Sequence, residues 1–140
     1  MEFILFDHYL PKEAIDIRYR VFTLEQGFAA EVDLDDKDSE SIHILVYESK
    51  SPIATARMFL EKEGTYHVGR LAVLKEYRHK GVGSYVLDVL ANKAKELGGH
   101  ELVLGSQIDK AGFYEANGFK KYGDIFDDAN YPHIMMKKSI

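Results

Sequence analysis

A turn with two glycines, Arg78-His79-Lys80-Gly81-Val82-Gly83-Ser84, joins a β-rich segment to a long helical pattern. Residues 84–97 have apolar side chains at the spacing of one helix face, and Gly98-Gly99 marks the end of the pattern. Where a strand leads through a turn into a helix, unpaired backbone N–H groups converge on one point, at which an anion can bind. The fold must therefore allow a long helix to begin at this turn.

The segment before the glycine turn predicts an antiparallel meander. A strand at 2–6 is followed by a helix that begins near Pro11 and ends near Gly27. An acidic loop comes next, at 28–41. Hairpin-length gaps then separate three β-rich segments, which lie at 42–48, 53–61 and 66–74.

The segment after the long helix adds a second set of strands. We expect a strand at 101–105, a helix at 109–116 and strands at 119–126 and 133–138. A strand, helix, strand unit within a largely antiparallel set predicts a mixed sheet of about six to seven strands, with helices on both faces. The fold class is therefore α/β (α+β), and residues 1–140 form a single domain.

Composition and charge exclude several classes of protein. The chain has no cysteine and a net charge of −5, so disulfides and thiolate metal sites are absent and a general attraction to nucleic acid is not expected. The N-terminus lacks the basic start and cleavage site of a signal peptide, and no apolar run approaches the roughly 20 residues of a membrane span. We expect a cytoplasmic protein with no metal, no nucleic-acid partner and no membrane partner.

The glycine turn by itself favours a diphosphate ligand. Gly81 and Gly83 allow backbone angles and close approaches that other residues do not, and the preceding cations add positive charge. A Walker loop would need Lys and Ser or Thr directly after its second glycine, and a Rossmann fingerprint would need a glycine in place of Val86. Neither motif is present. A plain connection into a helix is an equally good explanation of the turn taken alone.

Two separated motifs resemble the GNAT superfamily of N-acetyltransferases. The acetyl-CoA motif of that family, Arg/Gln-x-x-Gly-x-Gly/Ala between a strand and a helix, is matched by residues 78–83. An aromatic pair followed by Gly-Phe is matched by Phe113-Tyr114 and Gly118-Phe119. The stretches YRVFTLEQGF and YPHIMM are similar to the ElaA-like branch. The expected order of strands and helices fits the GNAT fold along nearly the whole chain.

The resemblance implies an acetyl-CoA-dependent N-acetyltransferase that moves an acetyl group directly from the CoA thioester to a primary amine of a small molecule or protein. The glycine turn would hold the CoA diphosphate, the preceding strand would pair with the pantetheine arm, and the N–H of Val73 would lie near the developing oxyanion. Gln107 stands where many relatives have an Asn that contacts CoA. The implied cofactor-binding residues are Leu71, Ala72, Val73, Arg78, His79, Lys80, Gly81, Val82, Gly83, Ser84 and Gln107.

The resemblance also implies the catalytic groups. Tyr114 matches the general acid that gives a proton to the departing thiolate, although an aromatic core residue is the ordinary alternative. His67 stands where relatives often have a Glu that acts as general base, and an ordinary strand histidine is its alternative. Glu25, Glu31 and His133 are further candidates for the base.

Two questions of function stay open at this point. A non-catalytic acyl-CoA-binding regulatory module is the alternative to an enzyme, because the Glu expected on the central strand is missing. The acidic loop either recruits a cationic acceptor or is a solvated surface; its carboxylates include Asp33, Asp35, Asp36, Asp38 and Glu40. Dimers through a sheet edge or the C-terminal hairpin are common in the resembled family, which makes a homodimer an expectation from resemblance alone.

Overall fold

The computed structural model describes residues 1–140, apart from the side chain of Val32. One seven-stranded sheet has the order β1-β2-β3-β4-β5-β7-β6. β4 and β5 run parallel, and the other neighbouring strands run antiparallel. The strands are β1 (Glu2–Asp7), β2 (Ile42–Glu48), β3 (Ser51–Lys62), β4 (Thr65–Val73), β5 (Glu101–Gln107), β6 (Lys120–Asp128) and β7 (Tyr131–Ser139). The predicted mixed and mostly antiparallel sheet is confirmed.

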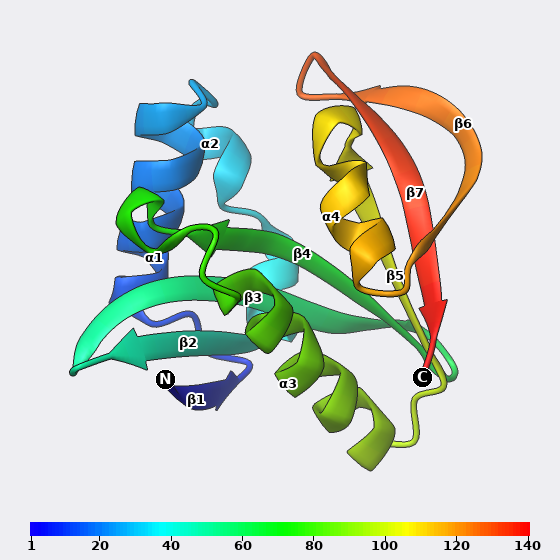
Figure 1. The fold of residues 1–140 in the computed structure, drawn as a ribbon, viewed down its shortest axis with the longest axis horizontal. Helices are drawn as coiled ribbons and strands as arrows, with labels where there is room; N and C mark the ends of the chain where they lie inside the picture. The colour runs from blue at the N-terminus through cyan, green and yellow to red at the C-terminus, as the bar shows by residue number, and fades with distance from the viewer.

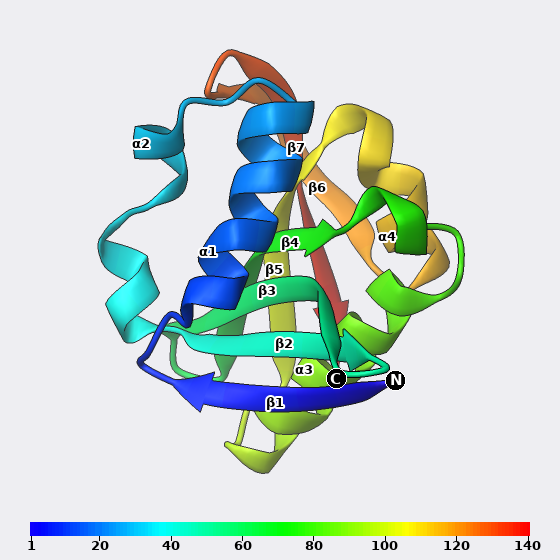
Figure 2. The same ribbon diagram turned by 90° about the vertical axis from the view of Figure 1, so that its left-hand side faces the viewer.

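Helices cover both faces of the sheet, as the sequence predicts. Figures 1 and 2 show α1 across one face of β2, β3 and β4, with α3 on the opposite face and α4 beside β5. The expected N-terminal helix is α1 followed by a π-helical segment, η1. The helices are α1 (Lys12–Arg18), η1 (Tyr19–Glu25), α2 (Ala30–Asp33), η2 (Asp36–Glu40), η3 (Lys75–Tyr77), α3 (Val82–Glu96), η4 (Ile108–Lys110) and α4 (Ala111–Ala116).

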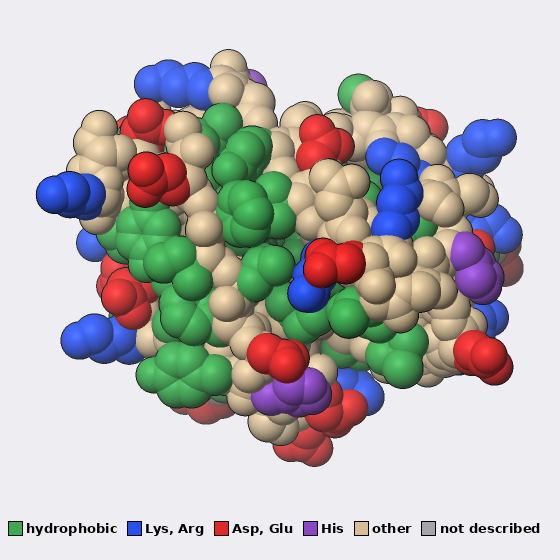
Figure 3. All heavy atoms as spheres, turned by 90° about the horizontal axis from the view of Figure 1, so that it is seen from below, with side chains coloured by type: hydrophobic (Ala, Val, Ile, Leu, Met, Phe, Trp, Pro, Cys, Tyr) green, Lys and Arg blue, Asp and Glu red, His purple; other side chains and the backbone are tan. Residues whose placement is uncertain are grey.

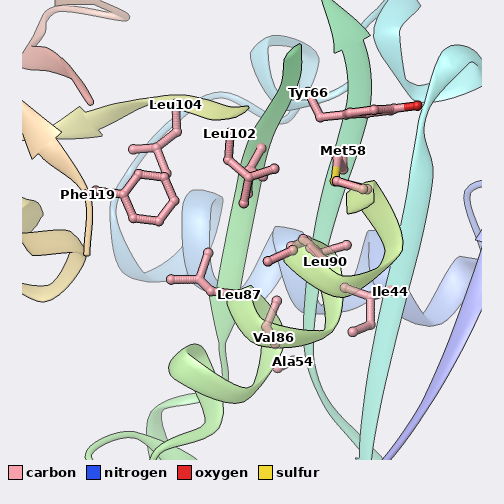
Figure 4. Close-up of a cluster of buried hydrophobic side chains, with 14 of the residues drawn as sticks. Ile44, Ala54, Met58, Tyr66, Val86, Leu87, Leu90, Leu102, Leu104 and Phe119 are labelled. Carbon is pink, nitrogen blue, oxygen red and sulfur yellow. The ribbon is translucent and has the colours of Figure 1, made fainter. Parts of the chain in front are cut away.

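Two hydrophobic clusters hold these helices on the sheet. Figure 4 shows the larger cluster, in which Leu90 of α3 lies among side chains such as Ile44 and Met58. The smaller cluster joins Ile17 of α1 to Leu45 of β2. Ile44 and Leu45 are both fully buried, because successive strand residues point to opposite faces and each face has its own helix. The apolar run of β2 is therefore typical of a strand that is covered on both faces.

The edge strand β1 carries exposed hydrophobic side chains. Phe3 and Ile4 are 44% and 48% exposed, and the Phe3 ring makes an edge contact with Tyr85 of α3 at a centroid distance of 6.2 Å. Figure 3 views the molecule from the side on which β1 and α3 lie, and hydrophobic side chains gather across that face. An open edge can pair with another strand. The homodimer predicted through a sheet edge would use a surface of this kind.

Three aspartates of the acidic segment bind arginines, and two of them, Asp33 and Asp38, are buried. Arg18 of α1 is 1% exposed; its Nε donates to Asp33 Oδ2 and its Nη1 to Asp38 Oδ1, each at 2.9 Å. Arg57 of β3 donates through Nη2 to Asp35 Oδ2 at 3.0 Å and through Nη1 to Asp38 Oδ1 at 3.1 Å. The interpretation of residues 28–41 as a solvated loop is therefore wrong for Asp33 and Asp38, which are buried. Asp35 is exposed but is paired with Arg57.

A third arginine joins the same cluster from β4. Arg70 donates through Nε to the backbone oxygen of Asp33 at 3.0 Å and through Nη2 to Asp35 Oδ2 at 3.2 Å. We call these six residues the Arg–Asp network: Arg18, Arg57, Arg70, Asp33, Asp35 and Asp38. It ties α2 and η2 to α1, β3 and β4. Asp36 and Glu40, which are exposed, are not part of this network.

Replacing Arg18 with Met should strongly destabilise the fold. The substitution leaves Asp33 and Asp38 buried without their main partner, and breaking a buried ion pair costs about 3–5 kcal/mol. The measurement is the free energy of unfolding in urea. Arg20→Met is the matched control, since Arg20 forms an exposed pair with Asp16 one helical turn away and should cost about 0.5 kcal/mol or less. Equal losses in the two variants would contradict a structural role for the network.

Acid should weaken the fold through the same network. Burial raises the pKa of Asp38, but the hydrogen bonds and charges of Arg18 and Arg57 outweigh it, and the pKa lies below its ordinary value of 3.8. The hydrogen bond from Arg57 lowers the pKa of Asp35 in the same direction. A lowered pKa contributes stability that is present above the ordinary value and is lost as the pH falls through the folded-state value.

We therefore expect the free energy of unfolding, measured in urea from pH 7 to pH 3, to fall in the acidic part of this range (roughly below pH 4). The Asp38→Asn variant should be less stable at pH 7 and should show a shallower fall, because one proton fewer binds on unfolding. An unchanged slope would mean that Asp38 does not contribute to acid sensitivity.

Candidate active site

β4 and β5 are paired only where they begin. Residues 65–67 of β4 lie opposite 101–103 of β5, and beyond these positions the two strands separate. β5 continues along β7, while β4 continues along β3. The last residues of β4, which include Leu71, Ala72 and Val73, therefore have no strand partner on the β5 side, within a chain whose backbone is described throughout. An extended ligand with amide groups can take the place of that partner.

A β-bulge accompanies this separation. Arg57 of β3 lies opposite Gly69, whereas Thr55 lies opposite Ala72, so β4 has an extra residue between them. Arg70 stands in the bulge with φ of 50°. A bulge bends its strand and increases the local twist. Arg70 belongs to the Arg–Asp network. The other members of the network therefore fix the residue at which β4 bends.

The glycine turn connects the end of β4 to α3. Gly81 is the N-cap residue of α3 and has φ of 81°, a left-handed conformation that favours glycine. No side chain caps this helix end within the described residues, so the first N–H groups of α3 stay available to an anion. His79 and Lys80 are exposed beside the turn. The side chain of Val82, in contrast, is part of the hydrophobic core.

Gly83, the second glycine of the turn, lacks a side chain for a different structural reason from Gly81. A Cβ atom added at Gly83 would lie 2.8 Å from Cζ of Phe113, so a side chain there would require the Phe113 ring to shift. The two sequence motifs therefore meet here, since Phe113 belongs to α4 and Gly83 to the first turn of α3. Sequence reasoning assigned Gly83 to ligand approach and missed this contact. The aromatic pair and the spacing of the glycines were the signals that could have indicated it.

Arg78 links the end of β4 to η1. Its Nε donates to the backbone oxygen of Val73 at 2.9 Å, and its two terminal nitrogens donate to the two carboxylate oxygens of Glu25, one of them at 2.7 Å. The hydrogen bond from Arg78 lowers the pKa of Glu25. Three of the five N–H donors of Arg78 are thus used within the protein, and two are left for a ligand.

Tyr114 lies on α4 among aromatic side chains. Its ring makes edge contacts with Phe113 and Phe119 at centroid distances of 5.0 and 5.8 Å, and it packs against the larger core cluster. Burial raises the pKa of Tyr114 to about 12. Its phenol therefore stays protonated near neutral pH and can donate a hydrogen bond.

Gln107 and His133 lie at the other side of the separation. Nε2 of Gln107 donates to Oε1 of Gln26, which directly follows η1, at 2.9 Å. His133 lies opposite Gln107 in the β5–β7 register, and its Nδ1 is 2.7 Å from the backbone oxygen of Tyr131. Gln26 was not among the residues predicted from sequence. Its contact with Gln107 spans 81 residues, and no local pattern signals such a pair.

The structure does not bring His67 to this group. His67 belongs to the paired beginning of β4, six residues before Val73, or roughly 20 Å along an extended strand. Its Nδ1 lies 2.8 Å from Oε1 of Glu61, and its ring stacks on Phe59 at a centroid distance of 4.9 Å. Glu31, another candidate for the base, is exposed on α2.

The described part of the chain has neither a candidate metal site nor a candidate membrane-spanning helix. Its His, Asp and Glu side chains form no cluster of three or more that could hold a metal ion. Its helices include none that is long and apolar enough to cross a membrane.

Known proteins share both the sequence pattern and the fold. The model of the acetyltransferase (GNAT) domain matches residues 13–140. The Bacillus subtilis protein YjcF, described as an uncharacterized N-acetyltransferase, is 34% identical over 128 residues, which cover 91% of each chain.

Solved structures agree with this match. A Lactobacillus plantarum protein superposes with a TM-score of 0.90 at 25% identity and covers 99% of this chain and 97% of its own. ElaA of Escherichia coli has the same fold, with a TM-score of 0.84 at 23% identity over 98% of each chain. The resemblance inferred from the two motifs is confirmed. The chain therefore belongs to the acetyltransferase (GNAT) family, and by that membership it is an N-acetyltransferase.

Proposed function

We propose that this chain transfers the acetyl group of acetyl-CoA to a primary amine of a small molecule or protein. The observation that carries the proposal is the unpartnered end of β4, which leads directly into the uncapped N-terminus of α3. A pantetheine arm and a diphosphate need these two features side by side. An aminoglycoside 6'-N-acetyltransferase solved in complex with coenzyme A has a similar fold, with a TM-score of 0.76 at 17% identity.

In this proposal the diphosphate binds the backbone N–H groups that follow Gly81. His79 and Lys80 supply positive charge, and Arg78 supplies its two remaining donors while it holds the turn against Glu25. Ser84 adds a hydroxyl in the first turn of α3. Along β4, the pantetheine arm would pair with the backbone of residues 71–73.

The reaction requires one bond to form and another to break. The amine nitrogen attacks the thioester carbonyl carbon, and the C–S bond breaks as the new C–N bond forms. The N–H of Val73 would stabilise the oxyanion. Tyr114 would be the general acid: its protonated phenol stabilises the charge that develops on sulfur and supplies the proton that the thiolate takes.

One observation favours the alternative of a non-catalytic acyl-CoA-binding regulatory module. His67, in the place of the expected Glu, is paired with Glu61 at the closed end of the sheet. Acetyl-CoA titration separates binding from no binding, and thiol release across a panel of primary amines separates an enzyme from a binding module. We expect both heat of binding and thiol release. Binding without release from any amine would favour the module, and absence of binding would contradict both functions.

Replacing Tyr114 with Phe should lower kcat by about 100-fold or more, because the departing thiolate loses its proton donor. The affinity for acetyl-CoA, measured by calorimetry, should change little. Tyr122→Phe, a loss of one hydroxyl on the exposed strand β6, is the matched control and should leave kcat unaltered. If Tyr114→Phe lowered affinity and kcat equally, Tyr114 would have a binding role in place of the acid role.

Replacing Gly81 with Val should mainly weaken acetyl-CoA binding. A β-branched residue at φ of 81° is strained by about 1–3 kcal/mol, and relief of that strain turns the N–H groups away from the diphosphate. We expect Kd to rise at least about tenfold, which corresponds to about 1.4 kcal/mol, with little change in kcat at saturating acetyl-CoA.

Gly98→Val is the matched control for that variant. Gly98 follows the other end of α3, has φ of 88° and has open space around its Cβ position, as Gly81 does. Both variants should lose similar stability on heating, and only Gly81→Val should bind acetyl-CoA more weakly. Similar Kd values in the two variants would contradict a specific role of the turn.

A further inference from the structure

The proposed reaction needs a group that takes a proton from the acceptor amine, and three of the four candidates are poorly placed. Glu25 has both carboxylate oxygens on Arg78, which lowers its pKa and its strength as a base. His67 is paired with Glu61 where β4 and β5 are still joined. Glu31 is exposed on α2. His133 is left, and its surroundings differ from those of the other three.

The hydrogen bond at Nδ1 determines which nitrogen of His133 can act as a base. The partner of Nδ1 is the backbone oxygen of Tyr131, at 2.7 Å, and a carbonyl oxygen only accepts. Nδ1 therefore carries the proton, and in the neutral ring the free lone pair is on Nε2. Nε2 has no partner among the described residues and is not one of the unpartnered atoms sealed from solvent. It is available to a ligand.

The register places His133 on the correct face of the sheet. His133 lies opposite Gln107 of β5 and opposite Phe126 of β6, and directly opposite residues share a face. Gln107 meets Gln26 after η1, so this is the face on which α1 and η1 lie. One strand spacing, about 5 Å, separates β7 from β5, which borders the opening beside β4.

Aromatic rings surround the imidazole from two strands. The rings of Phe126 and Tyr131 lie at centroid distances of 5.8 and 6.0 Å from it, and Phe28, after η1, reaches Tyr131 at 6.4 Å. The titratable groups on this side are Tyr131 itself and Asp109, whose carboxylate raises the pKa of Tyr131. The charge of Glu25, across on η1, is paired with Arg78.

We infer that His133 is the general base of the transfer; this rests on the proposed function. As the amine nitrogen bonds to the thioester carbonyl carbon, Nε2 of His133 takes one proton from that nitrogen. The electron pair of the C–S bond leaves on sulfur, which is protonated from the side of Tyr114. The imidazolium then returns its proton to solvent, and the Tyr114 phenolate takes one proton back from solvent.

His133→Asn tests the inference, because the amide nitrogen of Asn can keep the hydrogen bond to the Tyr131 oxygen while the lone pair of Nε2 is lost. The acceptors are 2-phenylethylamine, spermidine, glucosamine and Nα-acetyl-lysine, with thiol release from acetyl-CoA as the readout. We expect kcat to fall by about 10²- to 10⁴-fold, an unchanged acetyl-CoA Kd, and loss of the acidic limb of the pH profile. His8→Asn is the control, since the exposed His8 also has Nδ1 on a backbone oxygen, that of Ser39.

The outcomes separate this inference from the proposed function. If His133→Asn kept the turnover of the wild type and the acidic limb of its pH profile, the inference would be overturned but the proposed function would stand. The same would follow if His67→Asn lost turnover and His133→Asn did not. Absence of wild-type turnover with every amine would count against the proposed function. In that case, nitrogen-15 NMR of the imidazoles in the acetyl-CoA complex still tests the inference, because it shows which nitrogen of His133 carries the proton. A proton on Nδ1 and a bare Nε2 support it, and a proton on Nε2 overturns it.

Discussion

The Arg–Asp network is the interaction on which the shape of this sheet depends. Arg70 stands in the bulge of β4, and its guanidinium is held by Asp33 and Asp35. Arg18 of α1 and Arg57 of β3 donate hydrogen bonds to the same aspartates. Buried charges need partners of opposite charge, so the network couples the position of the acidic segment to the point at which β4 leaves β5.

The separation of β4 from β5 distinguishes the glycine turn from an ordinary connection into a helix. A turn into a helix is common, and the uncapped end of α3 becomes a plausible diphosphate site because the unpartnered backbone of β4 leads into it. α4 completes the arrangement: Phe113 packs on Gly83, and Tyr114 follows it on the same short helix. The family's two motifs therefore lie in contact, with the Phe113 ring against the backbone of Gly83.

The sequence predicted what local patterns encode and missed what distant pairs decide. The meander, the helix after the glycine turn and the mixed sheet follow from periodicity and turn residues. The pairing of Asp33, Asp35 and Asp38 with arginines does not, because these arginines lie 15 to 37 residues away and an acidic run looks the same whether solvated or paired. The resemblance suggested His67, whose position along β4 keeps it from the opening. The tautomer of His133 depends on a backbone oxygen, which sequence patterns do not describe.

Hydrogen exchange of individual backbone amides, with and without acetyl-CoA, tests the central claim most directly. If the ligand completes β4 and the turn, the amides of residues 71–73 and 81–84 should be slowed by acetyl-CoA, and those of β1 and of the far end of α3 should not. Binding of acetyl-CoA that leaves the amides of β4 and the glycine turn unprotected would contradict the account.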